Sequence, residues 1–153
     1  MKHLKKSTES YVIKLGTVTF WFLFWLFNVI DKFVGGSTFL WVGKDRLVQF
    51  QELFSSIGIE DPIVASIFLG LVTFAEIVAL FLLSTALVSL VQKKSEQARL
   101  FFFWGTFTGL AIFSFFAIGD QIFGERHQLL EHTTYWMALV ISWGAYTYFP
   151  RAK

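Results

Sequence analysis

The chain has 153 residues, of which 55% are hydrophobic, 20% are aromatic and only 16% are charged. A soluble domain carries about 25% charged residues, and one of this length could not bury so much apolar surface. The composition therefore excludes a soluble enzyme and a disordered chain, and it predicts an integral membrane protein. The lack of cysteine excludes disulfides, thiolate metal sites and dithiol redox chemistry, and the net charge of +2 is too small to indicate nucleic-acid binding.

Four apolar stretches are long enough to cross a bilayer, which takes about 20 residues in a helix. They cover residues 15–34, 63–91, 100–118 and 133–149. None of them alternates between apolar and polar residues as a β-strand would, so the expected fold class is all-α. We expect one transmembrane domain over residues 1–153, folded as a four-helix bundle with an interfacial helix between the first two spans.

The connection between the first two stretches contains that interfacial helix. Its apolar residues recur at helical spacing: Leu47, Phe50, Phe54 and Ile57. An amphipathic helix beside a membrane is expected to lie in the interface. Gly58 is expected to end it, and Asp61 followed by Pro62 is typical of a helix start, with Asp61 as the N-cap.

The distribution of Lys and Arg predicts the orientation, because cytoplasmic segments of membrane proteins carry an excess of these residues. Nine fall on one side of the predicted topology: Lys2, Lys5, Lys6, Lys14, Lys93, Lys94, Arg99, Arg151 and Lys153. Four fall on the other side: Lys32, Lys44, Arg46 and Arg126. We therefore expect both termini in the cytoplasm, and a bacterial inner membrane as the location.

Small residues indicate where membrane helices approach one another, because lipid is as apolar as the helix surfaces. The third stretch contains Gly105-x-x-x-Gly109, a narrow seam for close contact, although this spacing also occurs by chance. In the second stretch, small and polar residues gather within about a third of the helix circumference at 100° per residue. They are Ser66, Gly70, Thr73, Glu76 and Ser84. We expect these faces to point into the bundle.

Glu76 is the strongest signal for a site, because it lies near the middle of the second stretch among Leu, Ile, Val and Phe. An ionised carboxylate at the bilayer centre costs roughly 2.5–3.5 kcal/mol on insertion scales. We therefore expect Glu76 to be protonated, paired with a cation, or placed beside a polar ligand atom. Two interpretations stay open: a carboxylate that binds a ligand or relays protons, and a neutral hydrogen-bonding group between helices.

Asn28, Asp31 and Lys32 form a polar group at the outer end of the first stretch. Lys32 can snorkel outward to the lipid headgroups, which is the simpler interpretation, or reach inward as the best-placed cation for Glu76. Together with Thr73 on the same face as Glu76, these residues are the predicted ligand-binding or buried polar site.

A metal site at His127, Glu131 and His132 is an alternative, because carboxylate and imidazole at helical spacing can share a metal. An acidic, hydrated helix start is the simpler interpretation, since Glu131 near a helix N-terminus suits the helix dipole. The paired Glu-x-x-His pattern of di-iron bundles is missing, and haem would need two histidines at matching depth. The aromatic residues have a simple interpretation as interfacial belts and lipid-facing side chains. The less favoured alternative is that Trp21, Trp25 and the aromatic residues from Phe102 to Phe116 contact a quinone, pigment or lipid ring.

Several short motifs follow one another between residues 20 and 90. They are FNVIDKF at 27–33, the amphipathic segment at 50–57, GIEDP at 58–62 and the pair Glu76-Ile77. In this order they resemble the DoxX-like family of small four-helix membrane proteins, except that Asp31 stands where a glycine commonly precedes the lysine. The resemblance implies a place among subunits of quinone-reducing thiosulfate oxidoreductases or of other membrane redox complexes.

Three functions follow from these observations. We favour a small accessory or structural subunit of a larger quinone-linked redox complex, because no complete catalytic set is visible and the isolated chain is not expected to be an enzyme. The alternative is a quinone-handling oxidoreductase subunit with Glu76 and Lys32 in its site. A proton-coupled transporter using Glu76 is less favoured, since the repeats and broken helices of transporters are missing. The expected partners are membrane lipids and other membrane subunits, with quinone or lipid as a non-covalent ligand.

Overall fold

A computed structural model describes residues 2–34 and 45–148, and every secondary-structure element in these two ranges is a helix. The all-α prediction is therefore confirmed for the described residues. The elements are α1 (Lys2–Val34), α2 (Arg46–Ser56), α3 (Pro62–Val91), α4 (Ser95–Phe123) and α5 (Arg126–Tyr148).

Local capping sets the helix boundaries near the predicted site. Asp45 caps α2, and its side chain accepts hydrogen bonds from the backbone of the first turn. Gly58, with φ of +83°, follows the end of α2 in a conformation that favours glycine. Asp61 caps α3 and Pro62 is its first residue, as predicted. Gly124, with φ of +76°, ends α4 and lets the chain turn into α5.

Three predicted spans lie in helices that extend beyond them. The first was expected over residues 15–34, but α1 runs from Lys2 to Val34. The third was expected over residues 100–118, but α4 runs from Ser95 to Phe123. The fourth was expected over residues 133–149, but α5 begins at Arg126. The apolar run marks only the part of a helix that suits lipid, and hydrogen bonding continues through the polar turns at each end. These extra turns carry Asp120, His127, Glu131 and His132, which are described below.

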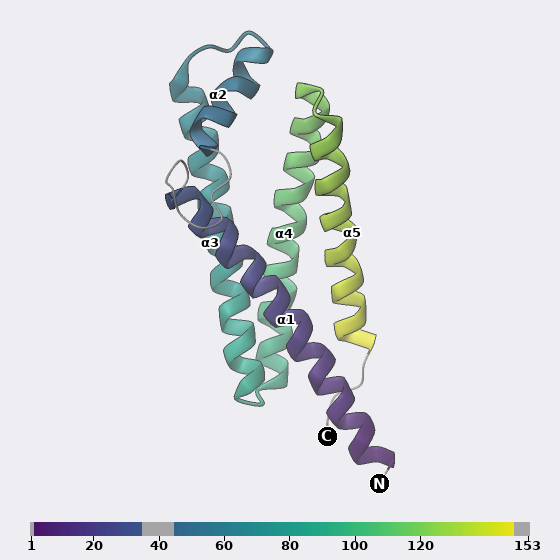
Figure 1. Cartoon of the computed structure of the whole chain (residues 1–153). Helices are drawn as coiled ribbons and strands as arrows, with labels where there is room; N and C mark the ends of the chain where they lie inside the picture. Colours follow the sequence, from purple (N-terminus) through teal and green to yellow (C-terminus); the bar gives the residue numbers. More distant parts are fainter. Residues whose placement is uncertain (1, 35–44, 149–153) are drawn as a thin grey trace.

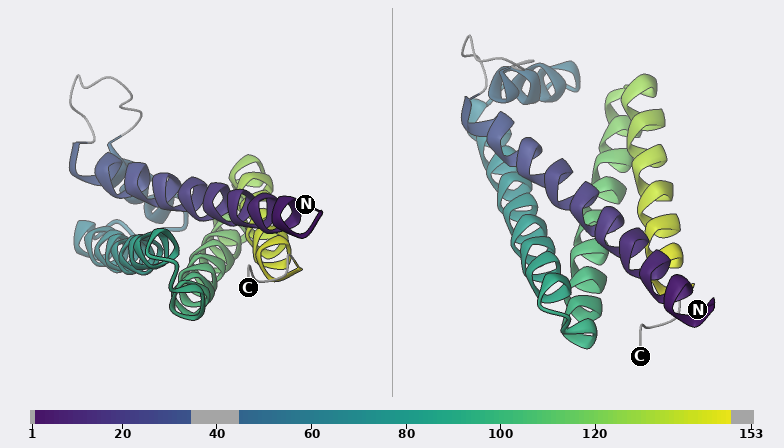
Figure 2. Two further views of the ribbon diagram at one scale, coloured as in Figure 1. Left: turned by 90° about the horizontal axis from the view of Figure 1, so that it is seen from below. Right: turned by 60° about the horizontal axis from the view of Figure 1, so that its bottom comes forward.

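The helices form a tilted arrangement rather than a parallel bundle. Figure 1 shows α3, α4 and α5 as successive up-and-down neighbours, with α1 crossing them diagonally. The two views in Figure 2 show the same crossing, and α2 lies over the outer part of α3. The helices α3 and α4 are close at their connecting turn and diverge toward the opposite end.

Three helices are long and apolar enough to cross a membrane: α1 from Thr8 onward, α3 and α4. Within the described ranges, α5 does not join them, because its first turns are rich in charged and polar side chains. Large apolar side chains are exposed along the outer faces of α3 and α4. Examples are Leu71, Phe74, Phe81, Phe103 and Phe107. Such an outer surface suits lipid contact rather than water.

The buried face of α3 differs from the face expected from the sequence. Its buried residues repeat at heptad-like spacing: Ala65, Val72, Glu76, Ala79, Leu83, Ala86 and Leu90. Glu76 belongs to this face, as predicted. Ser66 is exposed, and a side chain added at Gly70 would meet nothing within 4 Å. Ser66 donates to the carbonyl of Pro62, so the hydroxyl is satisfied inside its own helix and needs no partner. The small residues that α3 presents to the other helices are therefore mainly alanines, and not Ser66 and Gly70 as expected.

The glycine seam on α4 is a close contact in the structure. A Cβ atom at Gly105 would lie 2.8 Å from Cγ of Leu83 on α3. A Cβ atom at Gly109 would lie 2.8 Å from Cδ1 of Leu139 on α5 and 3.2 Å from Cζ2 of Trp25 on α1. The two glycines thus let α4 approach three other helices.

Candidate functional site

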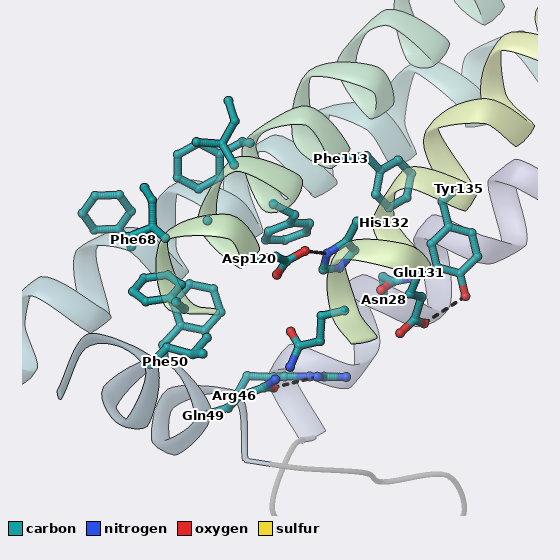
Figure 3. A pocket seen from close by; sticks show the side chains of 18 of the residues that line it. Asn28, Arg46, Gln49, Phe50, Phe68, Phe113, Asp120, Glu131, His132 and Tyr135 are labelled. Carbon is teal, nitrogen blue, oxygen red and sulfur yellow. Dashed lines mark hydrogen bonds and ion pairs between the residues drawn. The ribbon is translucent and has the colours of Figure 1, made fainter. Parts of the chain in front are cut away.

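A cavity of about 700 Å³ lies where α3 and α4 diverge, beneath α2. Most of its wall is apolar and aromatic: Phe24, Trp25, Phe50, Leu53, Phe54, Ile57, Phe68, Phe113, Phe115, Phe116, Ile118, Ile122 and Phe123. The polar residues of the wall come from all five helices: Asn28, Lys32, Arg46, Gln49, Glu76, Asp120, His127, Gln128, Glu131, His132 and Tyr135. Figure 3 shows polar side chains facing this space among the rings.

Lys32 on α1 and Glu76 on α3 form an ion pair in this wall. The Lys32 ammonium donates to Oε1 of Glu76 at 2.7 Å and lies 2.6 Å from Oε2. Their side chains are only 9% and 2% exposed, so water cannot screen the pair. Lys32 therefore points inward, and the simpler expectation that it snorkels to the headgroups is wrong. The pairing of Glu76 with a cation, one of the expected states, is confirmed.

The positions of the two residues on their helices explain the pairing. Glu76 lies on the buried face of α3, one turn from Val72 and Ala79. Lys32 follows the buried residues Trp21 and Trp25 at positions that keep it on the same side of α1. Since α1 crosses α3 at this level, the long Lys32 side chain reaches the carboxylate from the outer end of α1.

Asp31 and Asn28 have other partners than Glu76. Asp31 accepts hydrogen bonds from Arg46 on α2, whose Nε and Nη2 atoms both lie 2.6 Å from Oδ2. Arg46 also donates to Oε1 of Gln49 at 2.9 Å. Asn28 donates to the carbonyl of Phe24 in its own helix, and it lines the cavity. The Asp31–Arg46 pair therefore connects α2 to α1 at the rim of the cavity.

Thr73 does not contribute a side-chain hydrogen bond to the site. Its hydroxyl donates to the carbonyl of Leu69 at 2.7 Å, one turn earlier on α3. Threonine hydroxyls commonly bond to the preceding turn in this way when the helix interior offers no other partner. Of the five residues predicted for the site, the structure brings Asn28, Lys32 and Glu76 to the cavity wall.

A second polar pair in the wall joins α4 to α5. Asp120 is 7% exposed, and its Oδ2 atom lies 2.7 Å from Nδ1 of His132. The imidazole ring of His132 stacks on Phe116, with ring centroids 4.8 Å apart and planes 26° from parallel. Sequence reasoning missed Asp120 as a site residue. The available signal was the position of Asp120 one turn before Gly124, with His132 following soon after Gly124 in the sequence.

The metal site considered at His127, Glu131 and His132 is wrong for the described residues. No group of three or more His, Asp or Glu side chains there is close enough to hold a metal ion. His132 contacts Asp120 instead, and Glu131 accepts a hydrogen bond from the hydroxyl of Tyr135 at 3.1 Å. Because Glu131 and His132 are adjacent on α5, they point about 100° apart and face different neighbours.

Comparisons with known proteins add nothing to this geometry: no family model, curated protein or solved structure matches the chain. The resemblance of residues 20–90 to the DoxX-like family therefore stays a hypothesis that rests on its motifs. The function must be argued from the cavity itself.

Proposed function

We propose that the chain is a small membrane subunit that binds a quinone in the cavity and works within a larger membrane redox complex. The observation that carries the proposal is the buried Lys32–Glu76 pair in a wall made largely of aromatic rings. Small-molecule sites are mostly apolar with a few convergent polar groups. A quinone has the matching chemistry, because it is a flat apolar ring with carbonyl acceptors at its edge.

The charges around the cavity favour a neutral ligand. Lys32, Arg46 and His132 each face a carboxylate of the same chain. An anionic ligand would compete with those carboxylates for Lys32, Arg46 and His132. A cationic ligand would compete with the same three side chains for the carboxylates. Burying an additional charge would also carry a desolvation penalty. A neutral ligand leaves the existing pairs in place.

Lys32 is the proposed donor to one quinone carbonyl. An ammonium group carries three N–H donors and no acceptor. One of them donates to Oε1 of Glu76 at 2.7 Å, whereas Oε2 lies 2.6 Å away without accepting a hydrogen bond. Another N–H can donate to a ligand that enters the cavity. In this role Glu76 holds the Lys32 amine in position and neutralises its charge.

Reduction or oxidation of a quinone requires a redox centre. We propose that a partner subunit supplies this centre and therefore the electrons. The sequence has no cysteines for an iron–sulfur cluster and only three histidines. We therefore propose an accessory, ligand-binding role for this chain and no complete reaction within it.

Binding of 1,4-naphthoquinone to the full chain in lipid nanodiscs tests the proposal. Quenching of tryptophan fluorescence provides the signal, because Trp25 lines the cavity. The double variant Lys32→Met/Glu76→Leu removes both charges together, so no buried ion is left alone. We expect it to weaken binding about tenfold, which corresponds to the loss of one hydrogen bond of about 1.4 kcal/mol.

The matched control is Lys93→Met/Glu60→Gln, which removes one charge of each sign from exposed positions outside the cavity. Its affinity for 1,4-naphthoquinone should equal that of the unmodified chain. Equal affinity of the cavity variant and the control would contradict the proposed site, as would the absence of binding to the unmodified chain.

The proposed membrane placement uses four spans, with α5 beside α4 as the fourth and α2 in the interface. The start of α1 and the end of α5 lie at the same end of the molecule as the α3–α4 turn (Figure 1). The helix α2 and the α4–α5 turn lie at the opposite end. This supports the sidedness inferred from Lys and Arg, with both termini in the cytoplasm of a bacterium. Membership in the DoxX-like family would agree with this arrangement.

A purely structural subunit is the second candidate function. It is supported by the internal pairing of Lys32 with Glu76, which can simply hold α1 to α3, and by the apolar outer surface of α3 and α4. Affinity purification from native membranes distinguishes membership in a complex from independence. Partner proteins at fixed stoichiometry are expected under both candidates, and recovery only as a free monomer would contradict both. Naphthoquinone binding then separates them.

A further inference from the structure

We infer that the Asp120–His132 pair is a second polar anchor of the cavity, so that the ligand is a para-quinone held by both carbonyl groups. The inference rests on the proposed quinone site and names the ligand class and the residue at its far edge. Lys32 would donate to one carbonyl and Nε2–H of His132 to the other, with the ring lying between them among the aromatic side chains.

The first argument is the position of the pair in the cavity. Lys32 and Glu76 belong to α1 and α3, whereas Asp120 and His132 belong to α4 and α5. Both pairs line the same cavity, which lies where these two groups of helices diverge. The cavity therefore has one polar pair from each of these two groups of helices, in a wall that is otherwise mostly apolar and aromatic. A para-quinone has the corresponding chemistry, with a carbonyl oxygen at each of two opposite edges of a flat apolar ring.

The second argument is the way in which Asp120 holds the imidazole. A carboxylate 2.7 Å from Nδ1 favours the tautomer, or the protonated ring, in which Nδ1 carries hydrogen and donates to the carboxylate. The other nitrogen, Nε2, is then the ring atom left to meet a ligand. Asp120 is buried, so the carboxylate has little water to compete with the imidazole. Figure 3 shows His132 and Asp120 joined at the cavity wall.

The third argument is the fixed plane of the ring. The imidazole of His132 stacks on Phe116 at 4.8 Å and lies 6.2 Å from the ring of Phe113, at an angle of 30°. Aromatic neighbours and the carboxylate together limit rotation of the side chain. A polar group that is held in one orientation loses less entropy when it binds a ligand.

A protonation state must accompany the hydrogen bond from Nε2. If Asp120 accepts from Nδ1 and Nε2 also donates, the ring is the imidazolium, and Asp120 neutralises its charge. Binding of the quinone then requires no electron transfer and no bond cleavage, only two hydrogen bonds to two carbonyl oxygens. Loss of either donor should weaken a two-carbonyl ligand but spare a ligand that can use the remaining donor.

Two ring ligands of similar size separate these cases: 1,4-naphthoquinone, with two opposed carbonyls, and 1-tetralone, with one. In His132→Phe, which keeps a ring against Phe116, naphthoquinone binding should weaken about tenfold, as for one lost hydrogen bond. Binding of 1-tetralone should change less than about twofold, since its carbonyl can use Lys32. Met137→Phe, at an exposed position of the same helix outside the cavity, should bind both ligands as the unmodified chain does.

The variant His132→Phe/Asp120→Leu removes both partners, in case His132→Phe alone destabilises the fold by leaving a buried carboxylate unpaired. It should show the same selective loss. Infrared spectra of 1,4-naphthoquinone labelled with ¹³C at its carbonyls provide a readout that a structural role would not change. Both carbonyl bands should shift on binding to the unmodified chain, and one should return to its free position in either variant.

Each outcome has a distinct meaning. If the unmodified chain binds neither ligand, the proposed quinone site fails and the second anchor fails with it. If naphthoquinone binds and depends on Lys32 but loses no affinity in the His132 variants, the quinone site stands and the second anchor is overturned. An equal loss for both ligands, or an equal loss in Met137→Phe, also overturns the second anchor.

Discussion

Glu76 shows that a charged residue inside an apolar helix can depend on a second residue to neutralise its charge. The Glu76 side chain is 2% exposed, and Lys32 is the cation that contacts its carboxylate. Removing one partner of a buried pair leaves an uncompensated charge, which costs about 3–5 kcal/mol, whereas replacing both with apolar groups is often neutral. Substitutions of Glu76 and Lys32 should therefore have strongly non-additive effects on the free energy of unfolding.

We predict that Glu76→Ala lowers the free energy of unfolding by about 3–5 kcal/mol, because it leaves the Lys32 ammonium buried and alone. Adding Lys32→Met should recover much of this loss. Unfolding in detergent, followed by circular dichroism, measures both. A double variant that is less stable than Glu76→Ala would contradict the role of Lys32 as the charge partner.

The Asp31–Arg46 pair is only partly exposed, because the Arg46 side chain is 35% exposed and that of Asp31 is 12% exposed. Removing Arg46 leaves the mostly buried Asp31 carboxylate without its cation, and an unsatisfied buried group costs about 1–3 kcal/mol. We predict that Arg46→Met lowers the free energy of global unfolding by about 1–3 kcal/mol and loosens α2, which this pair ties to α1. Hydrogen exchange should become faster in the amides of α2 and not in α3. In Glu52→Gln, an exposed change on the same helix, exchange should stay as in the unmodified chain.

The Lys32–Glu76 pair could be predicted from the sequence, but the Asp120–His132 pair could not. A carboxylate in the middle of an apolar span demands a partner, and only a few cations lie within reach of it. Asp120 lies near the end of its helix, where a charged residue has an ordinary explanation in water or headgroups. Its importance depends on how far α4 extends past the apolar run and how α5 returns beside it.

At the scale of single helices, α4 is the element on which the packing depends. Gly105 and Gly109 bring it against α3, α5 and α1, with no room for a Cβ atom. The spacing of the glycines was visible in the sequence, but the three helices that share the seam were not. A motif indicates that close contact is allowed, whereas the tertiary structure decides which neighbour uses it.

We predict that Gly105→Leu and Gly109→Leu each destabilise the protein by at least about 1–3 kcal/mol, the usual cost of overpacking. Phe107→Leu, at a side chain that is 54% exposed, should change stability by less than about 0.5 kcal/mol. Gly70→Leu is the matched control, because a Cβ atom at Gly70 meets nothing within 4 Å. Thermal unfolding in detergent compares the four variants. Equal loss in Gly70→Leu would mean that the effect comes from glycine replacement and not from the seam.

The face of α3 illustrates where a helical-wheel argument fails. Small and polar residues were expected inside, yet Ser66 and Gly70 lie outside and alanines line the interface. A serine hydroxyl can bond to its own helix, so it does not need a protein partner even in lipid. A glutamate cannot do so, which is why Glu76 alone identified the correct side of the helix.

At the scale of the whole molecule, the diagonal crossing of α1 and the divergence of α3 from α4 create the cavity (Figure 2). The four apolar stretches predicted a helical membrane protein but contain no information about crossing angles. Those angles follow from which side chains meet at each contact. The bulky Trp21 and Trp25 on α1 are both 1% exposed and keep that helix above the layer of α3, α4 and α5.

The orientation in the membrane gives the last prediction. Positive charges predict that the α3–α4 turn is cytoplasmic and that α2 lies on the outer side, where headgroup-level water reaches its exposed face. The chain contains no native cysteine, so single cysteines report without background. In intact cells, a membrane-impermeant maleimide should label Glu60→Cys, just past α2, and should not label Ser95→Cys at the start of α4. Both positions are exposed, so permeabilised cells should show labelling at each and serve as the control. Labelling of Ser95→Cys but not of Glu60→Cys in intact cells would reverse the orientation, and α2 with the cavity beneath it would then lie on the cytoplasmic side.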